Sequence, residues 1–153
     1  MKLTFNESLA ILVAATTVGA VVFVIAEPIK RFKANRDQQR QVAIEQILEA
    51  IKKDQIDNGG SYLQDIAMLP TDAPALIGMA ATGCSTSCAP LLTQDACIDL
   101  TELVEQDYLE QVPIDPAAGT REQTGYYLIR TATGALEVGA CHPELTSTIK
   151  VSK

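Results

Sequence analysis

The sequence predicts an α+β protein in which a long N-terminal helix packs on a small antiparallel β-sheet head. Three observations support this prediction. An uncharged, mostly apolar run lies near the N-terminus, an amphipathic helical pattern follows it without a turn signal, and two β-prone segments lie near the C-terminus. A chain of 153 residues has room for one modest domain beside such a helix.

The first part of the helix is predicted to cross a membrane. Residues 8–26 carry no charge and lie between Glu7 and Glu27. At about 1.5 Å per residue, this run spans about 28 Å, close to the hydrocarbon thickness of a bilayer. We therefore expect residues 8–28, which follow the short segment of residues 1–7, to form a transmembrane helix. A cleaved signal peptide is the less favoured alternative, because the apolar run is too long for a typical signal.

A second helical pattern continues from the first. Apolar residues recur at the i, i+3, i+4, i+7 spacing of one helix face; they are Ile44, Ile47, Leu48 and Ile51. The residues Asn58-Gly59-Gly60 accept left-handed backbone conformations and predict the end of the helix. Pro28 removes a backbone donor, so a kink or local loosening is expected there. Residues 29–58 are thus predicted to form an amphipathic stalk helix.

The head is predicted to comprise residues 59–141. Residues 61–92 are rich in Pro, Gly, Ala, Ser and Thr, and this composition indicates a long connecting loop with one short helix or strand. Residues 97–108 (CIDLTELVEQDY) have the pattern of a short helix, with Asp99 or Thr101 as its cap.

A β-hairpin is predicted at the end of the head. Residues 125–130 are β-prone, and residues 136–141 alternate apolar residues with polar or small ones. Thr133-Gly134 between them supplies the turn. Residues 142–153 are predicted to form a loosely ordered, flexible C-terminal tail.

Charge is distributed unevenly within a net charge of −7. Residues 28–53 contain seven bases and three acids, whereas residues 54–137 contain thirteen acids and two bases. One interpretation is a solvated surface without a partner. The other is attraction between the acidic heads and basic stalks of neighbouring copies. The acidic field opposes nonspecific DNA binding by the head, and no specific nucleic acid is predicted as a partner.

All four cysteines lie in the second half of the chain, at Cys84, Cys88, Cys97 and Cys141. An even count in a small, membrane-tethered domain predicts two disulfides and an oxidising compartment. Three pairings exist, and we favour Cys84 with Cys88 as a local loop and Cys97 with Cys141 as the long closure. The alternative is a zinc site that adds His142, but structural zinc sites usually have two tight ligand pairs. His142 is instead predicted to lie in an exposed turn.

No catalytic constellation is found in the sequence, so neither an enzyme nor a cofactor is expected. The chain has no glycine-rich phosphate loop, and its one histidine lies in the tail. Paired acids such as Glu102 and Glu105 are predicted to lie on a solvated helix face. Asp115 and Gly119-Thr120 offer oxygens to calcium, but an acidic loop of this kind is more often just a turn. No metal site is therefore predicted.

Several segments of the chain resemble type IV pilins and pseudopilins. Residues 3–7 (LTFNE) are similar to the family's mature start, which has an apolar residue, Thr, two apolar residues and Glu; Asn6 departs from this pattern. Residues 27–32 (EPIKRF) and 36–40 (RDQQR) are similar to the Asn/Asp-Pro-x-Lys-Arg-Phe and Arg-Asp-x-x-Arg segments of one bacterial pilin-like group. Segments of the head follow in the same order as in that group, at residues 56–60, 77–78, 83–84, 97–100, 108–116, 125–126 and 138–141.

The resemblance covers nearly the whole chain and implies a subunit that polymerises into a helical filament, a homo-oligomer. The partners it implies are the inner membrane before assembly and the pilus or type II secretion assembly machinery. It assigns assembly to Leu3, Thr4, Glu7 and Pro28, and Glu7 is expected to neutralise the free amine of an adjacent subunit. The resemblance implies that residues 1–7 are a leader remnant and the mature start, and that the transmembrane helix at residues 8–28 becomes the filament core. The family is cleaved after a Gly, whereas this chain has Lys2 at that position.

The expected localisation is a single-pass membrane protein with an extracytoplasmic head, and a cell-surface filament after assembly. The basic residues at 30–36 favour a cytoplasmic head by the positive-inside rule, whereas four paired cysteines favour export, which we prefer. The expected role is adhesion, motility, secretion or DNA uptake. A non-polymerising, membrane-anchored extracytoplasmic binding module is the alternative.

Overall fold

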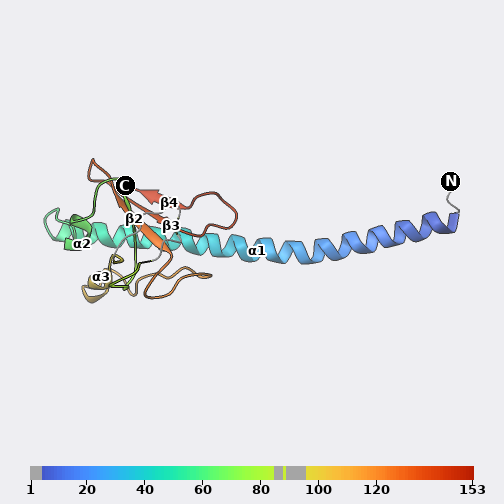
Figure 1. Cartoon of the computed structure of the whole chain (residues 1–153), viewed down its shortest axis with the longest axis horizontal. Helices are drawn as coiled ribbons and strands as arrows, with labels where there is room; N and C mark the ends of the chain where they lie inside the picture. The colour runs from blue at the N-terminus through green and yellow to red at the C-terminus, as the bar shows by residue number, and fades with distance from the viewer. Residues whose placement is uncertain (1–4, 85–87, 89–95) are drawn as a thin grey trace. The chain divides into compact units, whose positions relative to one another are not determined.

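The computed structural model describes the backbone of residues 5–84, 88 and 96–153, and within this set the side chains from residue 28 onward. The chain divides into two compact units, residues 1–35 and residues 36–153. We call the second the C-terminal unit. The described helices and strands are α1 (Phe5–Asp57), α2 (Gln64–Ala67), β1 (Pro74–Leu76), α3 (Thr101–Glu105), β2 (Tyr126–Arg130), β3 (Leu136–Ala140) and β4 (Lys150–Ser152) (Figure 1).

Helix α1 continues through Pro28, so the two predicted helical segments are one helix. It ends where the sequence predicts, because Gly59 and Gly60 adopt φ angles of 65° and 94°. The N–H of Gly60 donates to the carbonyl of Gln55 at 2.8 Å, and that of Gly59 donates to Ile56 at 3.2 Å. This pair of hydrogen bonds is a Schellman motif, which satisfies the last carbonyls of the helix.

The predicted transmembrane segment lies mostly outside the part of the chain whose side chains are described. Residues 1–4 are not described, and of residues 5–27 only the helical backbone is described. Among the residues whose side chains the structure describes, no helical stretch has both the length and the hydropathy of a membrane span.

The four described strands form one antiparallel sheet in the order β1-β2-β3-β4. Strands β2 and β3 are the predicted hairpin, with Tyr127 opposite Gly139. Its turn is also confirmed: Gly134 has a φ of 84°, and its N–H donates to the carbonyl of Thr131 at 2.9 Å. Within residues 61–92, the structure has both a short helix, α2, and a short strand, β1, which pairs with β2.

Two predictions about the later part of the chain are corrected. The tail is not loosely ordered throughout, because residues 150–152 form β4 on the edge of the sheet, with Val151 opposite Val138. Ile149 just before it is buried. A three-residue strand has too little sequence to show a pattern, and its partner β3 stabilises it. The helix predicted at residues 97–108 is shorter, at Thr101–Glu105. Its N-cap is Leu100, which makes no side-chain capping hydrogen bond, so neither Asp99 nor Thr101 is the cap; the Asp99 carboxylate accepts the Thr101 N–H at 2.8 Å just before the helix.

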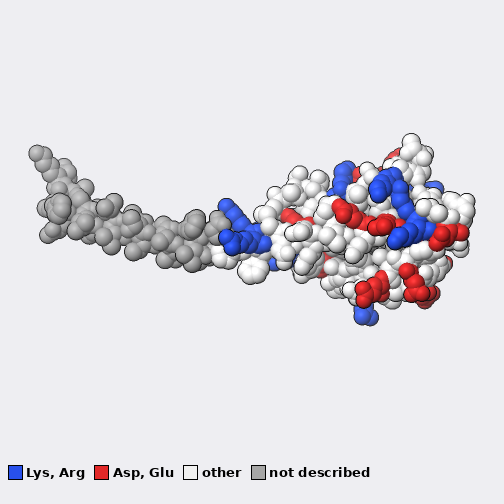
Figure 2. All heavy atoms as spheres, turned by 180° about the vertical axis from the view of Figure 1, so that it is seen from behind, with Lys and Arg blue, Asp and Glu red and all other residues white. Residues whose placement is uncertain are grey.

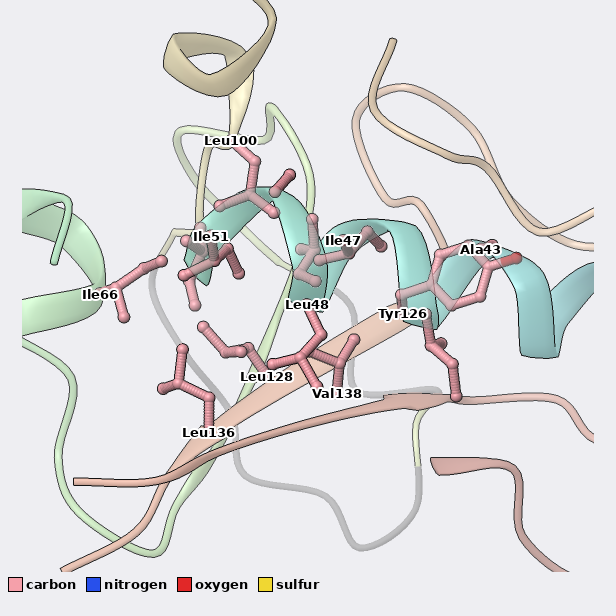
Figure 3. Close-up of a cluster of buried hydrophobic side chains, with 14 of the residues drawn as sticks. Ala43, Ile47, Leu48, Ile51, Ile66, Leu100, Tyr126, Leu128, Leu136 and Val138 are labelled. Carbon is pink, nitrogen blue, oxygen red and sulfur yellow. The ribbon is translucent and has the colours of Figure 1, made fainter. Parts of the chain in front are cut away.

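The apolar face of α1 packs on the sheet and forms the core of the C-terminal unit (Figure 3). All four residues of the predicted face are buried, and they contact a cluster that includes Leu128 and Val138 from the two central strands. Burying a Leu or Ile side chain contributes about 1.5–3 kcal/mol. These side chains therefore hold α1 on the sheet, and the α+β arrangement of a long helix on an antiparallel sheet is confirmed.

The two predicted disulfides are present, but the favoured pairing is wrong. Cys84 bonds Cys97, and Cys88 bonds Cys141. Backbone contacts explain the first pair: residues 77 and 98 form a bridge, and the Cys97 N–H donates to the Ala80 carbonyl at 2.9 Å. This contact brings Cys97 close to Cys84. The spacing of the cysteines along the chain does not reveal this proximity. Because all four cysteines are disulfide-bonded, no thiolate remains for zinc.

Candidate functional site: a buried ion cluster

Five charged side chains from three segments meet in the C-terminal unit. We call Arg36, Asp37, Arg40, Asp115 and Glu144 the ion cluster. The first three lie on α1, Asp115 lies in the turn that precedes β2, and Glu144 lies between β3 and β4. The cluster therefore connects the helix to two loops of the same unit.

At its centre, Arg40 binds Asp115 through two hydrogen bonds. Its Nε donates to Oδ2 at 2.6 Å and its Nη2 donates to Oδ1 at 3.1 Å, and neither side chain is exposed to solvent. The Asp115 carboxylate also accepts the N–H groups of Ala117 and Ala118 at 2.9 and 3.0 Å. Bidentate Arg–carboxylate pairs are among the stronger charge-assisted hydrogen bonds in proteins.

The surroundings of Asp115 distinguish between the two interpretations of its loop, a simple turn and a calcium site. Burial alone would raise the pKa of Asp115, but the hydrogen bonds from Arg40, Ala117 and Ala118 hold this pKa below its ordinary value. The carboxylate is thus ionised, and it faces a guanidinium and backbone donors. Such surroundings repel a cation. Asp115 therefore stabilises the turn through its backbone hydrogen bonds and forms an ion pair with Arg40.

The segment after β3 is attached to α1 by the other carboxylates. Asp37 accepts the N–H groups of Glu144 and Leu145 at 3.0 and 2.8 Å, and Nη1 of Arg40 at 2.8 Å. Burial would raise the pKa of Asp37, but these donors lower it. Glu144 accepts two hydrogen bonds from Arg36, both 2.6 Å, and one from Arg40 at 3.0 Å. The hydrogen bonds from Arg36, followed by those from Arg40, lower the pKa of Glu144 to about 2.

The geometry of the cluster suits positioning rather than catalysis. Removing charges from water costs free energy, so a buried pair of this kind contributes more to specifying an arrangement than to overall stability. Here the arrangement is the position of α1 against the Asp115 turn and the segment around Glu144. Part of the charge complementarity between basic helix and acidic head is therefore used inside one chain.

One signal in the sequence points to the cluster, although the sequence reasoning missed the contact. Arg40 precedes Ile44, Ile47 and Ile51 at spacings of 4, 7 and 11, so it lies on the apolar face of α1. Arginine is rarely buried without a partner, so its place in that face implies a buried carboxylate. The two segments that meet, residues 36–40 and 108–116, both belong to the resemblance.

The residues assigned to assembly are not brought together by the described structure. Leu3 and Thr4 lie outside the described residues, and Glu7 lies in α1 without a described side chain. Pro28 lies in α1 and is exposed. His142 is half-buried rather than exposed, and its Nδ1 is buried without a hydrogen-bond partner among the described residues.

Fold and cluster together define a class: a helix-on-sheet α+β unit, braced by a buried ion cluster and two disulfides. Comparisons of this chain with known protein families, with characterised proteins and with solved structures find no match.

Proposed function

We propose that this chain is a structural subunit of a type IV pilus-like or pseudopilus filament, which polymerises through its apolar N-terminal helix and displays an acidic head. The observation that carries the proposal is the continuity of α1. One helix, Phe5–Asp57, contains both the uncharged run at residues 8–26 and the face that packs on the sheet.

The physical argument follows from the two ends of this helix. An uncharged run long enough to span a bilayer is stable in lipid, and the same run of other copies offers it an apolar surface to pack against. The C-terminal end of α1 is held on the sheet by the core and the ion cluster. Assembly through the first end therefore displays the C-terminal unit, with its acids, on the outside of a filament.

In this proposal Glu7 pairs with the free amine of an adjacent subunit. A carboxylate that enters an apolar helix bundle needs such a partner, because an unpaired charge in that environment is costly. The proposed localisation is the membrane before assembly and the cell surface afterwards, with the pilus or type II secretion machinery as the assembly partner.

Electron microscopy of material sheared from cells that express the full chain tests the proposal. We expect filaments from the unaltered chain and none from the Glu7→Ala variant at equal expression. Glu49→Ala is the matched control, because the Glu49 side chain is 70% exposed and makes a loose 3.6 Å contact with Lys53. Filaments should persist in this control. Membrane-bound monomers alone, from the unaltered chain at normal expression, would overturn the proposal.

The second candidate is an anchored binding module, and a pocket of about 270 Å³ beside α3 favours it. This candidate predicts that a chain shortened to begin at Pro28 keeps full ligand binding. The filament proposal predicts that the same shortened chain assembles nothing.

A further inference from the structure

The pocket beside α3 has an apolar interior that reaches the surface. Its apolar lining comes from three segments and consists of Met79, Leu100, Val104, Val112 and Ile114. Met79 and Ile114 are 54% and 40% exposed, so the mouth of the pocket is apolar as well. An apolar group of another molecule that binds at this mouth is removed from water, which is favourable in free energy. We call this cavity the α3 pocket.

The other lining residues favour an aromatic ring over an aliphatic group. Arg121 lines the α3 pocket, and its guanidinium makes no hydrogen bond to any residue that the structure describes. A guanidinium interacts favourably with the face of an aromatic ring. The thioether of Met79 makes favourable contacts with ring edges. Both groups are already at the pocket, so a ring that enters it meets two suitable partners.

Carboxylates surround the α3 pocket and predict the charge of its occupant. Asp99 lines the pocket, Glu102 lies in the first turn of α3, and Glu122 follows Arg121; all three are exposed. Arg121 is the one base among the described lining residues. The surroundings are therefore acidic overall, and an aromatic group flanked by basic residues complements them.

The chain itself carries such a group. Phe32 on α1 is 64% exposed, and it lies between Arg31 and Lys33, with Lys30 close by in sequence. Figure 2 shows basic side chains gathered on the helix beside the grey residues, and acidic side chains in several groups on the C-terminal unit. The aromatic ring of Phe32 suits the apolar lining of the α3 pocket, and the basic residues beside it have the charge opposite to that of the surrounding carboxylates.

We propose that Phe32 of one copy inserts into the α3 pocket of a second copy, with the basic residues beside it facing the carboxylates around the pocket. This inference rests on the proposed filament, since it names one contact between its subunits. The two surfaces differ, so the contact is heterologous. Repeated from copy to copy, a heterologous contact that does not close produces an open helical array.

Site-specific photocrosslinking of the full chain in cells tests the contact. A photoreactive phenylalanine, p-benzoylphenylalanine, replaces Phe32, and crosslinked dimers from sheared filaments are analysed by peptide mass spectrometry. We expect crosslinks from position 32 to Met79 or to residues 99–114 of another copy. The matched control places the same group at Ile56, which is 74% exposed on α1 but lies beside Asp57 rather than between bases. Position 56 should not crosslink to the pocket.

A second variant tests the pocket without altering Phe32's neighbours. Met79→Lys places a positive charge at the exposed mouth, where folding is little affected; this charge repels the basic residues beside Phe32 and should abolish the crosslink from position 32. Filaments whose position-32 crosslinks reach other sites, other proteins or nothing would overturn the contact and leave the proposed function standing. If neither filaments nor copy-to-copy crosslinks from either position are found, the contact and the proposed function are both overturned.

Discussion

Replacing Arg40 with methionine tests whether the ion cluster holds α1 in place. Methionine keeps an unbranched apolar stem but removes the guanidinium, which is completely buried. Asp115 then stays buried with two backbone donors and no counter-charge. Breaking a buried pair in this way costs about 3–5 kcal/mol. A domain of this size has a total stability of about 5–15 kcal/mol, so the loss would be a large fraction of it.

Denaturant unfolding of the full chain in mild detergent measures this loss. All four tyrosines lie in the C-terminal unit, so tyrosine fluorescence reports on its unfolding alone. Lys53→Met is the control, because the Lys53 side chain is 60% exposed in its pair with Glu49, and such pairs contribute about 0–1 kcal/mol. Adding Asp115→Asn to the Arg40 variant should recover part of the loss, since the buried charge is gone. An Arg40→Met variant within about 1 kcal/mol of the unaltered protein would refute this reasoning.

Three further predictions follow from other parts of the C-terminal unit. The free energy of unfolding should fall as the pH drops from about 4.5 to about 2. The carboxylates of the ion cluster have lowered pKa values in the folded protein, so their contribution to stability disappears as they take up protons. Measuring the free energy of unfolding at a series of acid pH values tests this. Burial raises the pKa of Asp54, whose Oδ2 lacks a described partner, so Asp54→Asn should stabilise the unit at neutral pH and less so in acid. Gly139→Ala should cost about 1–3 kcal/mol in thermal unfolding, because its Cβ would collide with the Tyr127 ring across the strand pair.

The elements that were predicted well have strong local signals. The apolar face of α1 is visible in the spacing of four side chains, and the glycines that end the helix directly follow its last turn. The hairpin needs only two β-prone runs and a Gly that accepts a positive φ. In each case the residues that decide the structure are neighbours in the chain, so their pattern is sufficient.

The elements that were missed depend on contacts between distant segments. Strand β4 forms because β3 offers it an edge, and three residues do not show that pairing in advance. The disulfide pairing follows from the contact of residues 77–80 with residues 97–98, which the spacing of the cysteines does not encode. A short loop between Cys84 and Cys88 was the natural expectation from sequence distance.

By itself, the sequence determined a long helix with an apolar face, a hairpin and a cysteine-containing head, because periodicity and turn residues act locally. The tertiary structure alone decided where Arg40 finds its partners. Asp115 is 75 residues away and Glu144 is 104 residues away, so no local pattern links them. An arginine within an apolar helix face signals that a buried carboxylate must exist, but only the packing of α1 on the sheet determines which one it is.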